Sequence, residues 1–121
     1  MNVVDSSGWI EYLMDSDRAD LFASAIEADR LLLPTIALFE VHRVLSRSLS
    51  AKIVTRCLDV MRLGRVLDLT TAAPSRQRRC RDQLAMADAA MYSMAHEFGA
   101  TFWTQDVDYK GLPGVKLFLK P

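Results

Sequence analysis

Short apolar runs alternate with segments of helical periodicity along the whole chain, and this alternation limits the possible folds more than any other feature. The runs at 2–5, 31–33, 65–69, 101–104 and 115–119 are expected to be strands. Helices are expected at 9–13, 17–26, 35–48, 50–63, 70–83 and 85–98, with Asp17 and Thr35 as caps and Gly99 as a C-terminal stop. Such alternation predicts an α/β domain with a mainly parallel sheet and helices on both faces.

The length and composition fit one domain with an ordinary core. The chain has 121 residues, of which half are hydrophobic and a quarter are charged. We expect residues 1–121 to form a single domain without a membrane span or a signal peptide. Cys57 and Cys80 lack a partner motif, which fits buried thiols in a reducing, cytoplasmic setting.

Acidic residues recur where the expected strands end. Asp5 ends the first strand, and Asp106 follows the fourth. Glu40 and Asp88 lie early in the helices that start near the same edge. Asp88 lies at the border of an apolar arc that is expected to run on through Phe98, whereas Ser93 is expected on the polar arc. Since ligands of open parallel sheets bind beyond the carboxyl ends of the strands, these four acids are expected to converge there.

Converging carboxylates repel one another, and a bound cation removes that repulsion. An all-oxygen ligand set without cysteine or clustered histidine favours Mg²⁺ or Mn²⁺ over zinc. Each acid also has a simpler interpretation. Asp5 can cap the first helix, Glu40 can form a surface pair with Arg43, Asp88 can favour the helix dipole, and Asp106 can be a turn residue.

The zero net charge argues against a general nucleic-acid binder. If the four acids and Asp108 serve one metal site, however, ten acidic residues remain against 15 basic ones. Four of the basic residues lie within 76–81. A neutral total can therefore conceal a basic rim around an acidic pocket.

Several motifs in order give the chain a resemblance to a known family. They are VVDSS at the N-terminus, FE in the third helix, MADA at the start of the central helix, TQDVDY after the fourth strand and the closing GLPGVKLF. The chain resembles PIN domains, and among them the VapC-type toxin ribonucleases of bacterial toxin–antitoxin pairs. The resemblance implies a three-layer fold with a five-stranded parallel sheet and a metal-dependent ribonuclease activity.

The resemblance also assigns roles to residues. It implies that Asp5, Glu40, Asp88 and Asp106 form the catalytic, metal-binding quartet, with Ser6 and Thr104 as supporting hydroxyl groups near the metal. Asp108 can share or take over the role of Asp106. Two positions depart from the family pattern: Ala85 replaces a hydroxyl or proline, and Tyr109 replaces the commoner phenylalanine.

The implied mechanism is hydrolysis of an RNA phosphodiester by water activated on one or two Mg²⁺ or Mn²⁺ ions. Arg43, Arg76 and Arg79 are candidate RNA contacts, although a solvated helix face also explains the 76–81 cluster. The implied partners are a VapB-like antitoxin and a second copy of the chain. The apolar segments 21–26 and 36–49 are candidate surfaces for them.

Two other classes of function remain open. A receiver-like phospho-acceptor module would use Asp68, which follows Val66 and Leu67 near the end of the third strand, together with Thr104 and Lys116. It would leave Glu40 and Asp88 without a role. The other alternative is a catalytically inactive binding protein of the same fold.

Overall fold

A five-stranded sheet forms the centre of the molecule. The computed structural model describes residues 1–68 and 86–121. The strands are β1 (Asn2–Val4), β2 (Leu31–Pro34), β3 (Arg65–Leu67), β4 (Thr101–Thr104) and β5 (Val115–Leu117), arranged in the order β3-β2-β1-β4-β5. All four strand pairings are parallel, as the sequence predicts.

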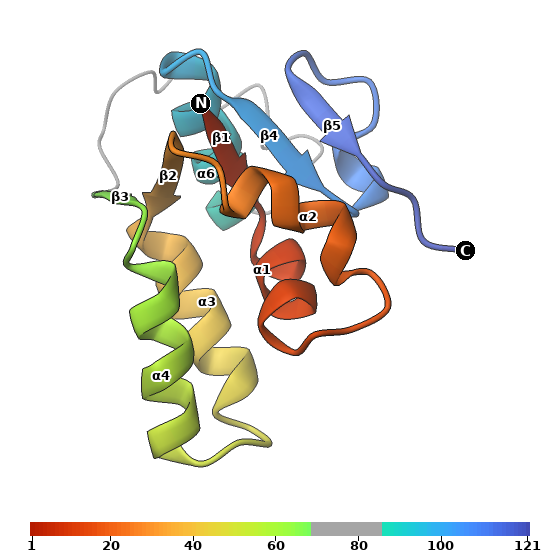
Figure 1. Cartoon of the computed structure of the whole chain (residues 1–121). Helices are drawn as coiled ribbons and strands as arrows, with labels where there is room; N and C mark the ends of the chain where they lie inside the picture. Colours follow the sequence, from red (N-terminus) through yellow and green to blue (C-terminus); the bar gives the residue numbers. More distant parts are fainter. Residues whose placement is uncertain (69–85) are drawn as a thin grey trace.

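Helices cover both faces of this sheet. They are α1 (Ser6–Leu13), α2 (Ala19–Ile26), α3 (Thr35–Leu45), α4 (Ala51–Met61) and α6 (Met86–Glu97), followed by the 3₁₀ helix η1 (Val107–Tyr109). Figure 1 shows α6 behind the sheet, α1 and α2 in front of it, and α3 and α4 as a neighbouring pair. The predicted three-layer α/β fold is therefore confirmed. The expected helix at 70–83 and Cys80 lie outside the described residues.

Several predicted boundaries need correction. Asp17 does not cap α2, because Arg18 occupies the N-cap position. Thr35 is the first helical residue of α3, since Pro34 before it has an extended backbone and takes the cap position. The first helix begins at Ser6, three residues earlier than predicted, and β3 and β5 each end two residues earlier.

The helix α6 is buried around more of its circumference than its sequence indicates. Ser93 was expected on a polar arc, yet only 2% of it is exposed, because α6 contacts β2, β4 and α3. Phe98 was expected on the apolar arc but is 38% exposed, since it lies beyond the last helical turn. The predicted stop at Gly99 is confirmed by its positive φ of 67°.

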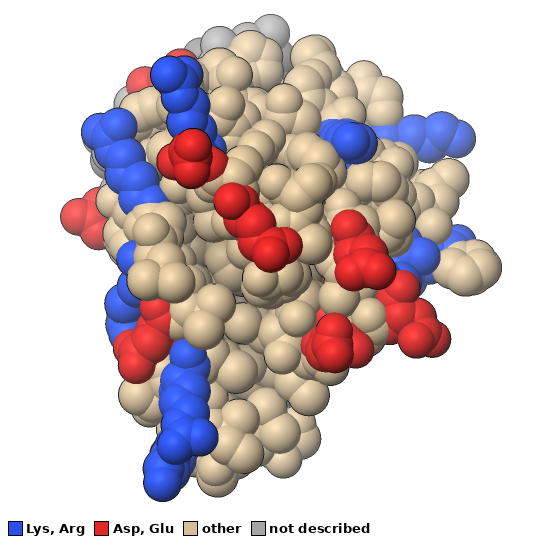
Figure 2. All heavy atoms as spheres, viewed as in Figure 1, with Lys and Arg blue, Asp and Glu red and all other residues tan. Residues whose placement is uncertain are grey.

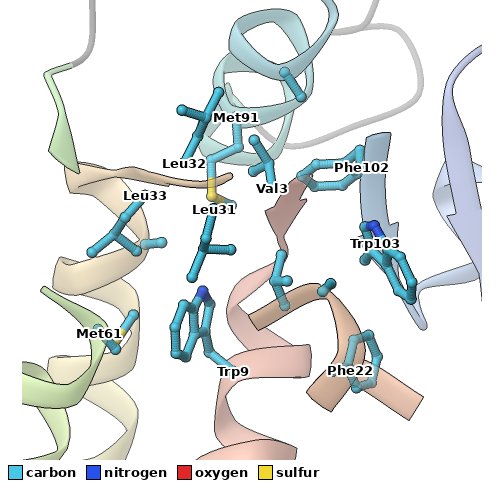
Figure 3. Packing of buried hydrophobic residues seen from close by; sticks show 14 of the residues in the cluster. Val3, Trp9, Phe22, Leu31, Leu32, Leu33, Met61, Met91, Phe102 and Trp103 are labelled. Carbon is cyan, nitrogen blue, oxygen red and sulfur yellow. The ribbon is translucent and has the colours of Figure 1, made fainter. Parts of the chain in front are cut away.

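The core packs side chains from both helical layers against the sheet. Figure 3 shows Met91 of α6 on one side of the strands and Trp9 and Phe22 on the other. Gly8 of α1 allows this packing, since a Cβ there would lie 2.7 Å from the ring of Phe22. The result is a packed sheet whose parallel strands all have their carboxyl ends at one edge. No helix in the described part is long and apolar enough to cross a membrane.

Candidate active site

A cavity of about 700 Å³ opens at the carboxyl ends of β1 and β4. All four acids that the sequence predicts to converge line it, each from a different segment of the chain. The full lining is Asp5, Ser7, Glu40, Asp88, Gln105, Asp106, Val107, Leu119 and Lys120.

Asp5 is the most constrained of the four acids, because it ends β1 and also caps α1. It is only 5% exposed. Its Oδ1 accepts a hydrogen bond from the backbone N–H of Ser6 at 2.7 Å, and its Oδ2 accepts one from Thr104 Oγ1 at 2.8 Å. Burial, with the charges of Asp88 and Glu40, raises the pKa of Asp5 to about 7. The capping role and the position in the cavity are therefore compatible.

A relay of hydrogen bonds continues from Thr104 into the turn after β4. Thr104 is fully buried, and its Oγ1 accepts a hydrogen bond from the backbone N–H of Asp106 at 3.1 Å. Asp106 Oδ1 in turn accepts one from the backbone N–H of Asp108 at 2.9 Å. Asp108 lies in η1, is exposed and does not line the cavity, but its charge helps to raise the pKa of Asp88.

Glu40 and Asp88 line the cavity from the middle of α3 and the first turn of α6. Burial raises the pKa of both carboxyl groups. The charge of Asp88 raises the pKa of Glu40 further, whereas the nearby Ser6 hydroxyl and the charge of Arg43 lower it. The nearby Tyr109 hydroxyl lowers the pKa of Asp88. Arg43 is exposed and lies close enough to act on Glu40 through its charge.

Oxygen atoms around the cavity have unused hydrogen-bonding capacity. Among the described residues, Ser6 Oγ, Ser7 Oγ, Glu40 Oε1 and the Tyr109 hydroxyl are buried without a hydrogen-bond partner. An oxygen-only set of carboxylates and hydroxyls is chemically suited to Mg²⁺ or Mn²⁺. Within residues 1–68 and 86–121, however, no three acids, histidines or cysteines are grouped closely enough to hold a metal. Ligation would require these carboxylates to approach one another.

Sequence reasoning missed several residues at this site. Gln105 is 6% exposed and lines the cavity, and its neighbour Asp106 was its only sequence signal. Lys120 lines the cavity from the end of the chain, and Arg18 contacts Gln105 from the start of α2. Of the predicted RNA contacts, Arg76 and Arg79 lie outside the described residues.

Comparisons with known proteins agree on one architecture. A profile of the PIN domain matches residues 3–115. Among solved structures, a toxin–antitoxin complex from Klebsiella pneumoniae is similar, with a TM-score of 0.83, 16% identity and coverage of 99% of this chain and 100% of that one. No curated protein sequence shows a significant match.

Two further solved structures show the same similarity. VapBC2 from Rickettsia felis, bound to a DNA fragment from its promoter, has a TM-score of 0.75, 14% identity and coverage of 99% and 98%. VapC20 from Mycobacterium tuberculosis, described as a sarcin–ricin loop cleaving toxin, has a TM-score of 0.74, 15% identity and coverage of 97% and 98%. At these identities the similarity establishes the fold.

Proposed function

The chain belongs to the PIN domain family, and from this premise we propose that it is a Mg²⁺- or Mn²⁺-dependent endoribonuclease, the toxin of a type II toxin–antitoxin pair. One observation carries the proposal. Asp5, Glu40, Asp88 and Asp106, from four separate segments, line a single cavity at the carboxyl edge of the sheet. Packing alone gives no reason to collect four carboxylates there, because their mutual repulsion is unfavourable.

In this proposal Asp5, Asp88 and Asp106 are metal ligands, with Glu40 beside them and Ser6 and Thr104 as supporting residues. A bound ion would polarise the scissile phosphate and lower the pKa of a water molecule bound to it. The hydrogen bonds from Ser6 N–H and Thr104 Oγ1 hold the Asp5 carboxylate in one orientation. Asp108 acts through its backbone N–H, which orients Asp106, and it is a weaker candidate ligand.

Glu40 is suited to accept a proton within the cavity. Its Oε1 is buried without a hydrogen-bond partner among the described residues, and its pKa is raised by burial and by the charge of Asp88. A raised pKa brings a carboxylate closer to the range in which a general base works well. Arg43 remains a candidate contact for an RNA phosphate, because it is exposed and close enough to Glu40 to act on its pKa.

The proposed partners follow from the relatives. The similar structures include toxin–antitoxin complexes, one of them named VapBC2, and a toxin that cleaves the sarcin–ricin loop. By analogy we assign this chain an RNA substrate and a VapB-like antitoxin. The proposed homodimer rests instead on the exposed apolar side chain of Phe39 on α3. Arg76 and Arg79 remain candidate RNA contacts.

The test is RNA cleavage by the purified chain with Mg²⁺ or Mn²⁺ and with excess EDTA. We expect cleavage products that depend on the metal and disappear with the chelator. Cleavage that persists in EDTA would contradict the metal-dependent mechanism. Absence of cleavage with either ion would favour an inactive binding protein.

The same preparation tests the receiver-like alternative through incubation with a small phosphodonor. Asp68 is exposed, follows the edge strand β3 and does not line the cavity. We therefore expect no phosphorylation of Asp68. A stable phosphoryl group on Asp68 would favour a signalling module over a nuclease.

A further inference from the structure

The C-terminal segment after β5 is fixed against the end of β4. The backbone N–H of Phe118 donates a hydrogen bond to the carbonyl of Thr104 at 2.9 Å. Its ring packs against Phe22 and Trp103, with ring centroids 5.5 and 5.9 Å away. The chain therefore leaves the sheet in a defined direction, directly beside the acidic cavity.

Arg18, at the N-cap of α2, ties this segment to the cavity wall. Its Nη2 donates hydrogen bonds to the carbonyls of Phe118 at 2.8 Å and Leu119 at 3.3 Å. Its Nε donates to Gln105 Oε1 at 2.7 Å and lies 3.7 Å from Glu11 Oε2. One guanidinium thus joins α1, the turn after β4 and the C-terminal segment, which Lys could not do with a single amine.

The consequence of this arrangement is that Lys120 lies in the wall of a cavity lined by four carboxylates. No ion pair joins it to any acid in the described part of the chain. Lys116, the nearest lysine in sequence, is engaged differently, since its Nζ lies 4.1 Å from the centroid of the Trp103 ring. Lys120 therefore contributes an exposed positive charge to the cavity wall without pairing with a described carboxylate.

We propose that Lys120 binds a phosphate of the RNA backbone next to the bond that is cut, and that Arg18 is the positioning residue, since it fixes the backbone of the two residues before Lys120. The proposal rests on the proposed ribonuclease function. A polyanion approaching four carboxylates is repelled, and a cation in the same wall offsets this repulsion locally. The contact is to the phosphate alone, so it carries no sequence preference.

The first experiment measures RNA binding in Mn²⁺ by fluorescence anisotropy, with a labelled single-stranded RNA of random sequence and the Asp5→Asn chain to prevent cleavage. Adding Lys120→Gln should weaken binding about threefold and reduce the salt slope of log K by about 0.7, the value for one phosphate contact on a single strand. Lys120→Arg, which keeps the charge, should retain both values.

Arg18→Gln should cause a similar loss of affinity and of salt slope. Combined with Lys120→Gln it should cause no additional loss, because both changes remove the same contact. Lys52→Gln, which removes an exposed lysine of α4 outside the cavity lining, is the matched control and should leave binding unchanged.

In the active chain, Lys120→Gln should raise KM for RNA about threefold and leave kcat within about twofold, since uniform binding is lost. Unchanged affinity and salt slope in Lys120→Gln would overturn this proposal while leaving the ribonuclease function intact. Tighter binding would also overturn it, because Lys120 would then be obstructing the cavity. If the Asp5→Asn chain binds no RNA and the active chain cuts none, the proposed function fails as well.

Discussion

At the scale of single residues, Asp5 combines two demands that normally conflict. It caps α1 and accepts two hydrogen bonds, yet it lies almost fully buried beside other carboxylates. The hydrogen bonds favour its charged form, while burial and its acidic neighbours oppose it, and burial is the larger effect. The site therefore holds Asp5 in a fixed geometry at a cost in stability.

This balance predicts how the metal-free protein responds to pH. The pKa of Asp5 is near 3.8 when unfolded and about 7 when folded, so the folded state binds more protons between these values. Stability should therefore fall as the pH rises from 4 to 7, by roughly 4 kcal/mol at most if Asp5 acted alone. Urea denaturation in EDTA at several pH values measures the free energy of unfolding as a function of pH. Asp5→Asn should flatten the profile, and a wild-type profile that is already flat would contradict the account.

Tyr109, where the resemblance implies a phenylalanine, gives a second prediction at this scale. The centroid of its ring lies 4.8 Å from that of Phe102. Its buried hydroxyl lies close enough to Asp88 to lower the pKa of that carboxyl group, although it does not reach full hydrogen-bond geometry with any described residue. Tyr109→Phe keeps the ring and removes a hydroxyl that is buried beside Asp88 without full hydrogen-bond geometry, so the free energy of unfolding should change by less than about 1 kcal/mol. A clear loss in chemical denaturation would show that the hydroxyl has a strong partner.

At the scale of elements, the strand–helix alternation was sufficient to predict the sheet and most helices, because apolar periodicity reports burial directly. The residues at which helices and strands begin and end were harder to predict. Pro34 connects β2 to α3 without a gap, so Thr35 became helical where a cap was expected. The burial of Ser93 depends on which elements α6 contacts in the folded chain, and no local pattern contains that information.

The contact between α1, α2 and β1 gives a prediction for one element. A Cβ at Gly8 would lie 2.7 Å from the Phe22 ring and 2.8 Å from Val4 Cγ1, closer than the packed core allows. Gly8→Ala should therefore lower the free energy of unfolding by about 1–3 kcal/mol, despite the better helix propensity of alanine.

Ser24→Ala, at an exposed position of α2, is the matched control for Gly8→Ala. It introduces the same residue without a steric conflict and should change stability by less than about 0.5 kcal/mol. Equal behaviour of the two variants in urea denaturation would show that Gly8 does not limit the packing.

At the scale of the whole molecule, charge is divided into regions although the total is zero. On the face drawn in Figure 2, basic side chains gather along the side of α4 and near β5, and acidic ones lie between them. The convergence of the four acids could be predicted because parallel strands place their carboxyl ends at one edge. The contact of Arg18 with Phe118, 100 positions away in sequence, could not be predicted, since it depends on the path of the folded chain.

Association is the prediction that belongs to this scale. Phe39 of α3 is 75% exposed, which is unusual for a large aromatic residue outside an interface. We expect a dimer in sedimentation experiments at tens of micromolar, roughly where moderate interfaces are filled. Phe39→Ala should weaken the dimer by about tenfold or more, as for an aromatic anchor. Phe98→Ala, at a less exposed position after α6, is the control. A wild-type monomer at this concentration would exclude the homodimer.

In the proposed mechanism four carboxylates of one cavity together carry out metal-dependent RNA cleavage, so neutralising each of them singly should abolish activity. The measurement is the rate of RNA cleavage in Mg²⁺ or Mn²⁺ by Asp5→Asn, Glu40→Gln, Asp88→Asn and Asp106→Asn, each checked for folding by circular dichroism. Asp108→Asn is the matched control, because this neighbouring carboxylate does not line the cavity. We predict that each of the four loses at least about 100-fold in rate, the usual lower range for a catalytic acid or base, while Asp108→Asn loses much less. Full activity in two or more of the four would contradict the account.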